Sequence, residues 1–434
     1  MLEIRNYIGG KLQPASSGGW LDDFEPATGK VYARIPDSGA TDVDAAVTAA
    51  ARAFPAWSAL PGEERGRWLL KLAELIERDL EKLAHAESVD NGKPVDLARR
   101  LDIPRAVSNL RFFAAAASQF ASESHAMESG AINYTLRSPL GVVGCISPWN
   151  LPLYLFTWKI APALAAGNCV VAKPSEVTPM TAYLFSELCA EAGLPAGVLN
   201  LVHGLGGKAG SAIVDHAGVK AVSFTGGTKT GADIASRAAP KFKKLSLELG
   251  GKNPVLVFAD ADWELALAES LRAAFTNQGE ICFCGSRIYV ERSVYTRFRD
   301  AFVERTKALK QGDPLEIGMQ QGALVSESHL QRVLGYIDLA QQEGGKLLCG
   351  GKRARLTGRC ADGWFLEPTV LEGLGPDCRV NQEEIFGPVV TLWPFDSEQE
   401  ALDLANGTPY GLTATVLSRD VARCHRLSTV AVSP

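Results

Sequence analysis

The chain has 434 residues, longer than a single hydrophobic core usually grows, so we expect two or more packed lobes. Its 44 Lys and Arg against 49 Asp and Glu give a net charge of −5, which argues against nucleic acid or an anionic membrane as a partner. Nine cysteines without CxxC spacing, and Arg5 and Asn6 where a secretion signal needs apolar residues, predict a reducing, cytoplasmic location. The most apolar stretch, 160–172, is too short and too interrupted to predict a transmembrane segment.

The first part of the chain is predicted to be a helical layer. Thr41 is a candidate helix N-cap, with Asp42 and Asp44 in the first turn that follows. Apolar residues then recur at helix spacing, namely Leu69, Leu72, Leu75, Ile76, Leu80 and Leu83.

From about residue 141 short β-branched runs alternate with helical segments. The runs are 142–146, 169–172, 198–202 and 221–224, and the helix predicted over 178–192 has a stop signal in Gly193 and Pro195. Strands that alternate with helices indicate right-handed crossovers and a parallel sheet. A second α/β segment begins near Lys252, includes a long helix ending near Asn277, and continues to about Ser418.

Three loops after predicted strands carry candidate binding groups, because the carboxyl edge of a parallel sheet binds ligands. The glycine-rich loop 224–231 opens a helix and suits a pyrophosphate, although an ordinary strand-to-helix turn is the better explanation of this loop taken alone. The Asn150 amide could donate to an oxyanion or simply cap its own turn. Lys173 and Glu176 could bind ribose hydroxyls or form a solvated ion pair.

Two further segments carry candidate reactive groups. Glu248 lies among apolar residues and glycines, an environment that raises the pKa of a carboxyl toward that of a general base, unless backbone amides satisfy it. Cys282 and Cys284 follow a helical stretch; a lone cysteine is more often a core residue than a nucleophile, and spacing alone does not distinguish Cys282 from Cys284.

Taken in order, six motifs resemble those of the aldehyde dehydrogenase superfamily. They are PWN at 148–150, KPSE at 173–176, FTGG at 224–227, LELGGK at 247–252, GEIC at 279–282 and EEIFGP at 383–388. The resemblance implies an α/β fold with a Rossmann-like NAD-binding domain at 1–250, an oligomerisation hairpin near 120–141, and an α/β catalytic domain at 251–418.

The resemblance also implies roles for the reactive groups. It makes Cys282 the nucleophile in preference to Cys284, Glu248 the general base, and Asn150 an oxyanion donor. The implied reaction is oxidation of an aldehyde by NAD through a thiohemiacetal and a thioester, which water then hydrolyses.

The same mapping implies a cofactor site and no metal. Its residues are Trp149, Lys173, Glu176, Gly226, Gly227, Gly231, Leu249, Glu384 and Phe386. Glu176 beside a ribose 2′-hydroxyl favours NAD over NADP, since it would repel a 2′-phosphate. Gly227 departs from the pattern of many members, which carry a serine there.

For the substrate, the strings at 147–168 and 276–284 look most like the branch that oxidises 2-aminomuconate and 2-hydroxymuconate semialdehydes in the catabolism of aromatic compounds and tryptophan. Arg105 maps to a position lining the substrate tunnel and suits a carboxylate, although a surface role near a helix start is equally plausible. Trp158 maps to the tunnel wall. Betaine or aliphatic aldehydes are the alternative substrates.

Members of the family normally continue beyond residue 426 with a strand that reaches a neighbouring subunit. Residues 419–434 are therefore expected to form a divergent, truncated tail, and an inactive product is a third hypothesis. The expected partners are a small aldehyde and further copies of the chain, in a homodimer or homotetramer.

Overall fold

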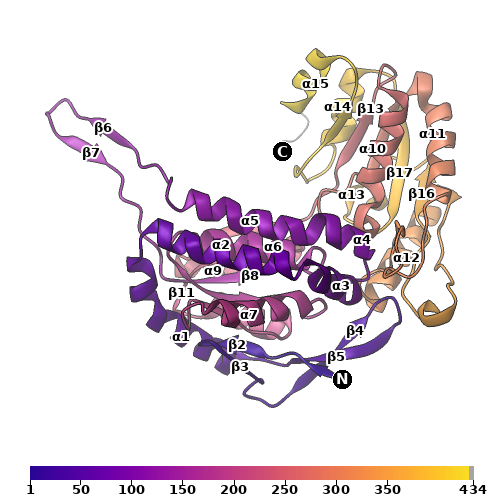
Figure 1. Cartoon of the computed structure of the whole chain (residues 1–434). Coiled ribbons are helices and arrows are strands. Elements are labelled where there is room, and N and C mark those ends of the chain that lie inside the picture. Colours follow the sequence, from indigo (N-terminus) through magenta and orange to yellow (C-terminus); the bar gives the residue numbers. More distant parts are fainter. Residues whose placement is uncertain (430–434) are drawn as a thin grey trace. The chain divides into compact units, whose positions relative to one another are not determined.

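The computed structural model describes residues 1–429, which form two compact units. Unit 1 comprises Met1–Phe24, Val31–Asp90 and Ala98–Glu248; unit 2 comprises Glu25–Lys30, Asn91–Leu97 and the chain from Leu249 onward. Figure 1 shows the elements of both units. Of the tail expected at 419–434, residues 430–434 lie outside the described part.

Unit 1 is built on a seven-stranded sheet in its described residues, with the order β12-β11-β8-β9-β10-β2-β3. The strands are β2 (Asn6–Ile8), β3 (Lys11–Gln13), β8 (Val142–Ile146), β9 (Cys169–Lys173), β10 (Leu199–Leu201), β11 (Val219–Thr225) and β12 (Lys244–Glu248). The five from β8 to β12 are parallel, and β2 pairs antiparallel with β10. The four strands predicted after residue 141 and their parallel pairing are thus confirmed.

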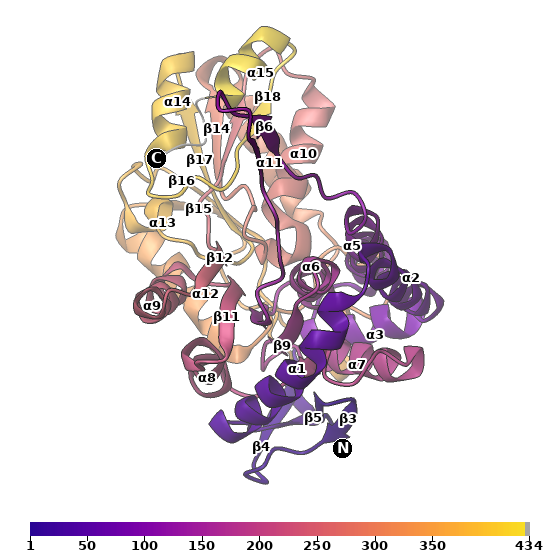
Figure 2. The same cartoon turned by 90° about the vertical axis from the view of Figure 1, so that its left-hand side faces the viewer.

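The central strands of this sheet are apolar on both faces because helices cover both. Every residue of β8 and β9 is buried, which is typical of a parallel sheet covered on both sides. α1 (Ala40–Ala59) and α6 (Pro152–Ala165) contact β8 and β9, whereas α8 (Ser211–Asp215) contacts β11 and α9 (Thr228–Ala238) contacts β12 (Figure 2).

The remaining elements of unit 1 form a helical layer, a small sheet and a hairpin. The helices are α2 (Gly62–Arg78), α3 (Leu80–Asn91), α5 (Ile103–Ala116) and α7 (Met180–Ala192). β1 (Leu2–Glu3), β5 (Lys30–Pro36) and β4 (Trp20–Glu25) form a three-stranded sheet. β6 (Ser124–Ala126) and β7 (Ile132–Tyr134) pair antiparallel at the tip of a long arm (Figure 1).

Unit 2 has a six-stranded sheet in its described residues, ordered β15-β16-β17-β14-β13-β18. Its strands are β13 (Pro254–Val257), β14 (Arg287–Glu291), β15 (Lys346–Cys349), β16 (Thr369–Glu372), β17 (Val389–Phe395) and β18 (Thr415–Leu417). The helices are α4 (Val95–Leu97), α10 (Trp263–Phe275), α11 (Arg292–Lys307), α12 (Glu327–Gln342), α13 (Arg379–Gln382), α14 (Glu398–Asn406) and α15 (Val421–Ser428).

Helix ends agree with the predictions at one site and differ at another. Gly193 ends α7 in the left-handed conformation, as its stop signal predicted. The prediction that Thr41 caps α1 is wrong: Gly39 is the N-cap, and the Asp42 carboxylate accepts the Gly39 N–H at 3.0 Å. An acidic side chain in the first turn has taken the capping role. Among the described residues no helix is long and apolar enough to cross a membrane.

Candidate active site

The loops that follow β8, β9, β10, β11 and β12 meet at one edge of the unit 1 sheet because these strands are parallel. The chain runs from β8 outward through β9 to β10 and then returns to place β11 on the other side of β8. Ligands bind at such a switch point, outside the carboxyl ends of the strands. The Trp149–Asn150 loop and the Gly226–Gly227 loop therefore flank the expected crevice.

Asn150 lies between the end of β8 and the start of α6 and is buried. The preceding Ser147 donates its backbone N–H to the Lys173 carbonyl at 3.1 Å, which ties the loop after β8 to β9. A buried amide on a loop tied in this way is held in place and suits a hydrogen-bond donor.

Lys173 and Glu176 form a charged pair after β9. The buried Lys173 Nζ donates to the Glu176 carboxylate at 2.9 Å, and the Gly206 N–H donates to the other Glu176 oxygen at 3.1 Å. Burial alone would raise the pKa of Glu176, but Lys173 and the Gly206 amide outweigh it and hold that pKa below its usual value. Glu176 is therefore an anion at neutral pH, fixed beside the loop that follows β10.

The glycine loop after β11 opens α9. Gly227 is the N-cap, and its carbonyl accepts the Gly231 N–H at 3.0 Å. At Gly226 a Cβ would lie 2.5 Å from the Phe224 ring, so only glycine fits there without movement of that ring. Neither Gly226 nor Gly227 places a side chain before the first turn of α9, which favours the close approach of an anion to the amides of that turn.

Glu248 ends β12, at the edge of the sheet, and its side chain is exposed. The prediction that apolar neighbours enclose this carboxylate is therefore wrong, because residues of this edge strand alternate between exposed and half-buried. Gly226 donates its N–H to the Glu248 backbone carbonyl at 3.0 Å, so the end of β12 lies beside the glycine loop.

Lys159 is a polar group near Glu248 that the sequence did not reveal. It lies on the apolar helix α6, is buried, and donates to Ser223 Oγ at 3.2 Å. Burial lowers the pKa of Lys159 to about 8, against the opposing effect of Cys145 and Glu248. Lys159, Trp158 and Glu248 line one hollow of about 410 Å³.

In unit 2 a strained turn precedes Cys282. Asn277, Gln278 and Gly279 follow α10 with φ of 53°, 55° and 69°, a left-handed run that non-glycine residues rarely adopt. Gln278 Nε2 donates to the Ala323 carbonyl at 3.2 Å, which helps to hold the turn. A Cβ at Gly279 would lie 2.2 Å from the Gly387 carbonyl, so glycine lets the EEIFGP loop approach.

Cys282 and Cys284 differ in burial. Cys282 is half-buried, whereas Cys284 is buried, and burial raises the pKa of the Cys284 thiol to about 12. Asn253 Nδ2 donates to the carbonyls of both cysteines, at 2.8 and 3.0 Å. A Cβ at Gly251 would lie 2.7 Å from the Cys282 carbonyl, so the LELGGK glycine makes this close packing possible.

Glu384 and Phe386 lie beside Cys282 in unit 2, and all three line a small hollow of about 20 Å³. Gly251 donates its N–H to Glu384 Oε1 at 3.1 Å, and burial raises the pKa of Glu384. Burial lowers the pKa of the nearby Lys252 to about 7, and the charge of Glu384 partly opposes this effect.

His329 contacts the backbone of Phe386, a residue in the left-handed conformation with φ of 64°. The His329 Nε2 lies 2.7 Å from the Phe386 carbonyl. Burial lowers the pKa of His329 to about 4, so the neutral ring donates its Nε2–H to this carbonyl. The buried Glu280 is 3.6 Å from the same nitrogen.

The two residues predicted to contact substrate lie on facing helices of unit 1. Arg105 on α5 is exposed, and its Nη2 donates to the Tyr154 hydroxyl of α6 at 3.3 Å. Trp158, one turn beyond Tyr154, is 43% exposed and packs edge-on against Phe113 of α5, with ring centroids 5.7 Å apart.

A parallel sheet with a switch point and a half-buried thiol that follows a strained turn are typical of an α/β enzyme with a nucleotide crevice and a cysteine nucleophile. The chain belongs to the aldehyde dehydrogenase family, whose model matches residues 13–431.

Individual proteins resemble the chain over nearly its full length. It is 52% identical to the 2-aminomuconic semialdehyde dehydrogenase of Danio rerio over 98% of this chain and 88% of that protein. It is 43% identical to the 2-hydroxymuconic semialdehyde dehydrogenase of Pseudomonas sp. (strain CF600), over 99% of this chain and 89% of that protein. Among solved structures, the chain resembles PnpE from Pseudomonas sp. WBC-3, whose crystal structure in complex with nicotinamide adenine dinucleotide is known. The two structures match with a TM-score of 0.96 at 43% sequence identity, over 99% of this chain and 88% of PnpE.

Proposed function

We propose that this aldehyde dehydrogenase uses NAD to oxidise 2-aminomuconate or 2-hydroxymuconate semialdehyde to the corresponding dicarboxylic acid. Relatives at 52% and 43% identity carry these substrates in their names, and a solved neighbour carries NAD. The observation that carries the proposal is the thiol of Cys282. It is half-buried, follows a strained turn, and shares a hollow with Glu384 and Phe386.

In the proposed reaction the Cys282 thiolate adds to the aldehyde carbon. The Asn150 amide and the Cys282 backbone N–H donate to the resulting oxyanion. NAD, when bound, would supply the acceptor for the hydride lost from this carbon, a loss that leaves a thioester on Cys282. Glu248 then takes a proton from water, the water attacks the thioester, and the acid leaves as the Cys282 thiolate re-forms.

The residues of unit 1 fit the adenosine end of NAD. The first turn of α9 offers free amides to a pyrophosphate next to Gly226, Gly227 and the buried Gly231. The Glu176 carboxylate and Lys173 ammonium are held near each other after β9 and suit ribose hydroxyls. In unit 2, Glu384 and Phe386 would hold the nicotinamide side, with Leu249 and, in unit 1, Trp149 as further contacts.

The charge of Glu176 makes a testable prediction about the cofactor. Glu176→Gln removes the anion that faces a 2′-phosphate, so kcat/KM with NADP should rise on the order of tenfold while kcat/KM with NAD falls. Steady-state rates with both cofactors measure this. Glu187→Gln on α7, which breaks an exposed ion pair with Lys82, should leave the ratio unchanged. An unchanged ratio in Glu176→Gln would contradict the assignment.

Arg105 is proposed to bind the carboxylate at the far end of the semialdehyde. Arg105→Ala should lower kcat/KM for the semialdehyde on the order of 10²-fold and leave hexanal oxidation within a few-fold, because removing one partner of a charged hydrogen-bonded pair costs about 2 to 5 kcal/mol. The matched control is Arg111→Ala, an exposed arginine of α5 paired with Glu77 at 2.7 Å. Equal loss for both aldehydes would show that Arg105 serves folding rather than selectivity.

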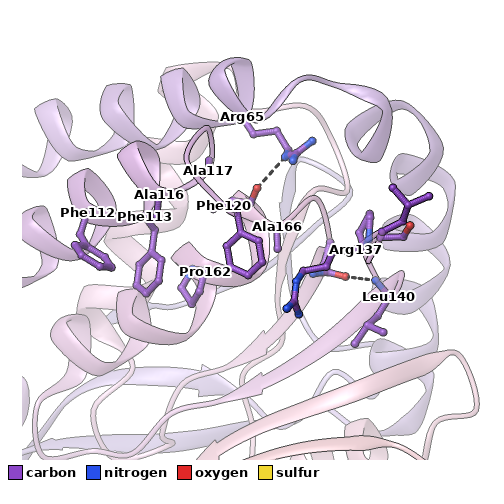
Figure 3. A pocket seen from close by; sticks show the side chains of 15 residues that line it. Arg65, Phe112, Phe113, Ala116, Ala117, Phe120, Arg137, Leu140, Pro162 and Ala166 are labelled. Atoms are coloured by element: carbon purple, nitrogen blue, oxygen red, sulfur yellow. Dashed lines mark hydrogen bonds between the residues drawn. The ribbon is translucent and has the colours of Figure 1, made fainter. Parts of the chain in front are cut away.

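We also propose that the chain forms a homodimer or homotetramer through the arm that carries β6 and β7. The arm exposes large apolar side chains, with Ile132 at 73% and Leu136 at 79% exposure. At its base lies a hollow of about 880 Å³, along which Phe113, Pro162 and Phe120 follow one another near the Arg65 guanidinium (Figure 3). Light scattering that gives the mass of one 46.4 kDa chain would contradict this.

The nine free thiols support a reducing compartment, and we propose the cytoplasm.

A further inference from the structure

The Tyr154 side chain contacts the Arg105 guanidinium in two ways. The Arg105 Nη2–H donates to the Tyr154 oxygen at 3.3 Å, and the guanidinium carbon lies 5.3 Å from the centroid of the Tyr154 ring. The guanidinium therefore packs over the ring and bonds to its hydroxyl at once, which restricts a long and exposed side chain.

The helix pair behind this contact is itself fixed. Asn109, one turn after Arg105 on α5, is buried and donates to the Tyr154 carbonyl at 3.0 Å and to Thr157 Oγ1 at 3.1 Å. The α6 backbone is thus tied to α5 at the same residue whose ring supports Arg105. Side chains held by packing and hydrogen bonds of this kind are pre-organised for binding.

The direction of the Arg105–Tyr154 hydrogen bond leaves one donor available. A guanidinium only donates, so the Tyr154 oxygen is the acceptor and its own O–H proton is not used in the bond. Within the described residues Arg105 is the one hydrogen-bond partner of this hydroxyl. The half-buried phenol and the exposed guanidinium therefore offer an O–H and several N–H donors side by side.

We propose that Tyr154 is a specificity-determining residue, whose hydroxyl donates to the same substrate carboxylate that Arg105 binds. This rests on the proposed semialdehyde activity and on the role of Arg105 in it. A carboxylate accepts several hydrogen bonds at once, so an O–H and an N–H donor can share it. The hydrocarbon part of the substrate would then lie toward Trp158 and Phe113, whose rings continue the same two helix faces.

The test is a double-mutant cycle with Tyr154→Phe and Arg105→Ala, assayed with 2-hydroxymuconate semialdehyde and with hexanal. Tyr154→Phe removes the hydroxyl and keeps the ring under Arg105. We expect kcat/KM for the semialdehyde to fall on the order of tenfold, mostly through KM, with hexanal unchanged. In the Arg105→Ala background the same substitution should have a much smaller effect. The matched control is Tyr295→Phe on α11, which removes a hydroxyl that donates a hydrogen bond to the Glu372 carboxylate of β16.

The outcomes separate this inference from the proposed function. If Arg105→Ala lowers selectivity but Tyr154→Phe does not, the role of Tyr154 is wrong and the function stands. If neither variant changes selectivity, the carboxylate site lies elsewhere and both assignments are wrong. If Tyr154→Phe lowers both rates equally, the hydroxyl serves folding and the inference is overturned.

Discussion

Cys282→Ala is expected to abolish aldehyde oxidation, with a loss of at least about 10³-fold in kcat, because no covalent intermediate can form without the thiolate. The rate is measured by NADH absorbance. Binding of NAD, which tryptophan fluorescence monitors, should persist. Retained binding would show that the variant is folded. Turnover within tenfold of the parent chain would overturn the assignment of the nucleophile.

Cys284→Ala is the matched control for that experiment. The Cys284 thiol is buried, with its pKa raised to about 12, and its Sγ lies 3.9 Å from the Thr276 carbonyl. A thiol with that pKa is protonated at pH 7 and is a poor nucleophile, so this variant should keep its rate within a few-fold. Loss of activity in Cys284→Ala together with survival of activity in Cys282→Ala would exchange the two roles.

Glu248→Gln is expected to stop the reaction after the hydride leaves. General-base catalysis contributes about 10² to 10⁴-fold, so the steady-state rate should fall by that order, whereas the first turnover continues. Rapid mixing should then give a burst of up to one NADH per chain, and mass mapping should find the acyl group on the Cys282 peptide.

The absence of a burst would show that Glu248 acts before hydride transfer rather than on water. Glu264→Gln, an exposed glutamate of α10 paired with Arg305, is the control and should show neither a burst nor a slower rate. Lys159 lies in the same hollow as Glu248, so a smaller effect on the slow phase is also expected when Lys159 is replaced by methionine.

Much of the fold could be predicted from residue patterns. Runs such as 142–146 and 169–172 are β-branched and apolar throughout, because both faces of β8 and β9 are covered. Gly193 marked the end of α7 because only a residue without a Cβ reaches the left-handed conformation easily. The N-cap of α1 was wrongly assigned to Thr41, because the sequence does not show that the Asp42 carboxylate accepts a hydrogen bond from the Gly39 amide.

The chemistry of the site was only partly predictable. The environment of Glu248 was misjudged because apolar neighbours in the sequence point to the other face of an edge strand. Asn253 and His329 were missed because each acts on a distant segment, on the Cys282 carbonyl and on the Phe386 carbonyl respectively. A buried lysine inside an apolar helix, as Lys159 is, was the one signal that could have been followed, since such a charge needs a partner.

The most direct test of the proposed function is NAD reduction by the purified chain with 2-hydroxymuconate semialdehyde, compared with betaine aldehyde and hexanal, and with Cys282→Ala as the blank. We predict turnover that depends on Cys282, with kcat/KM highest for the semialdehyde. Turnover confined to betaine aldehyde or hexanal, or no turnover from a folded chain that binds NAD, would contradict it.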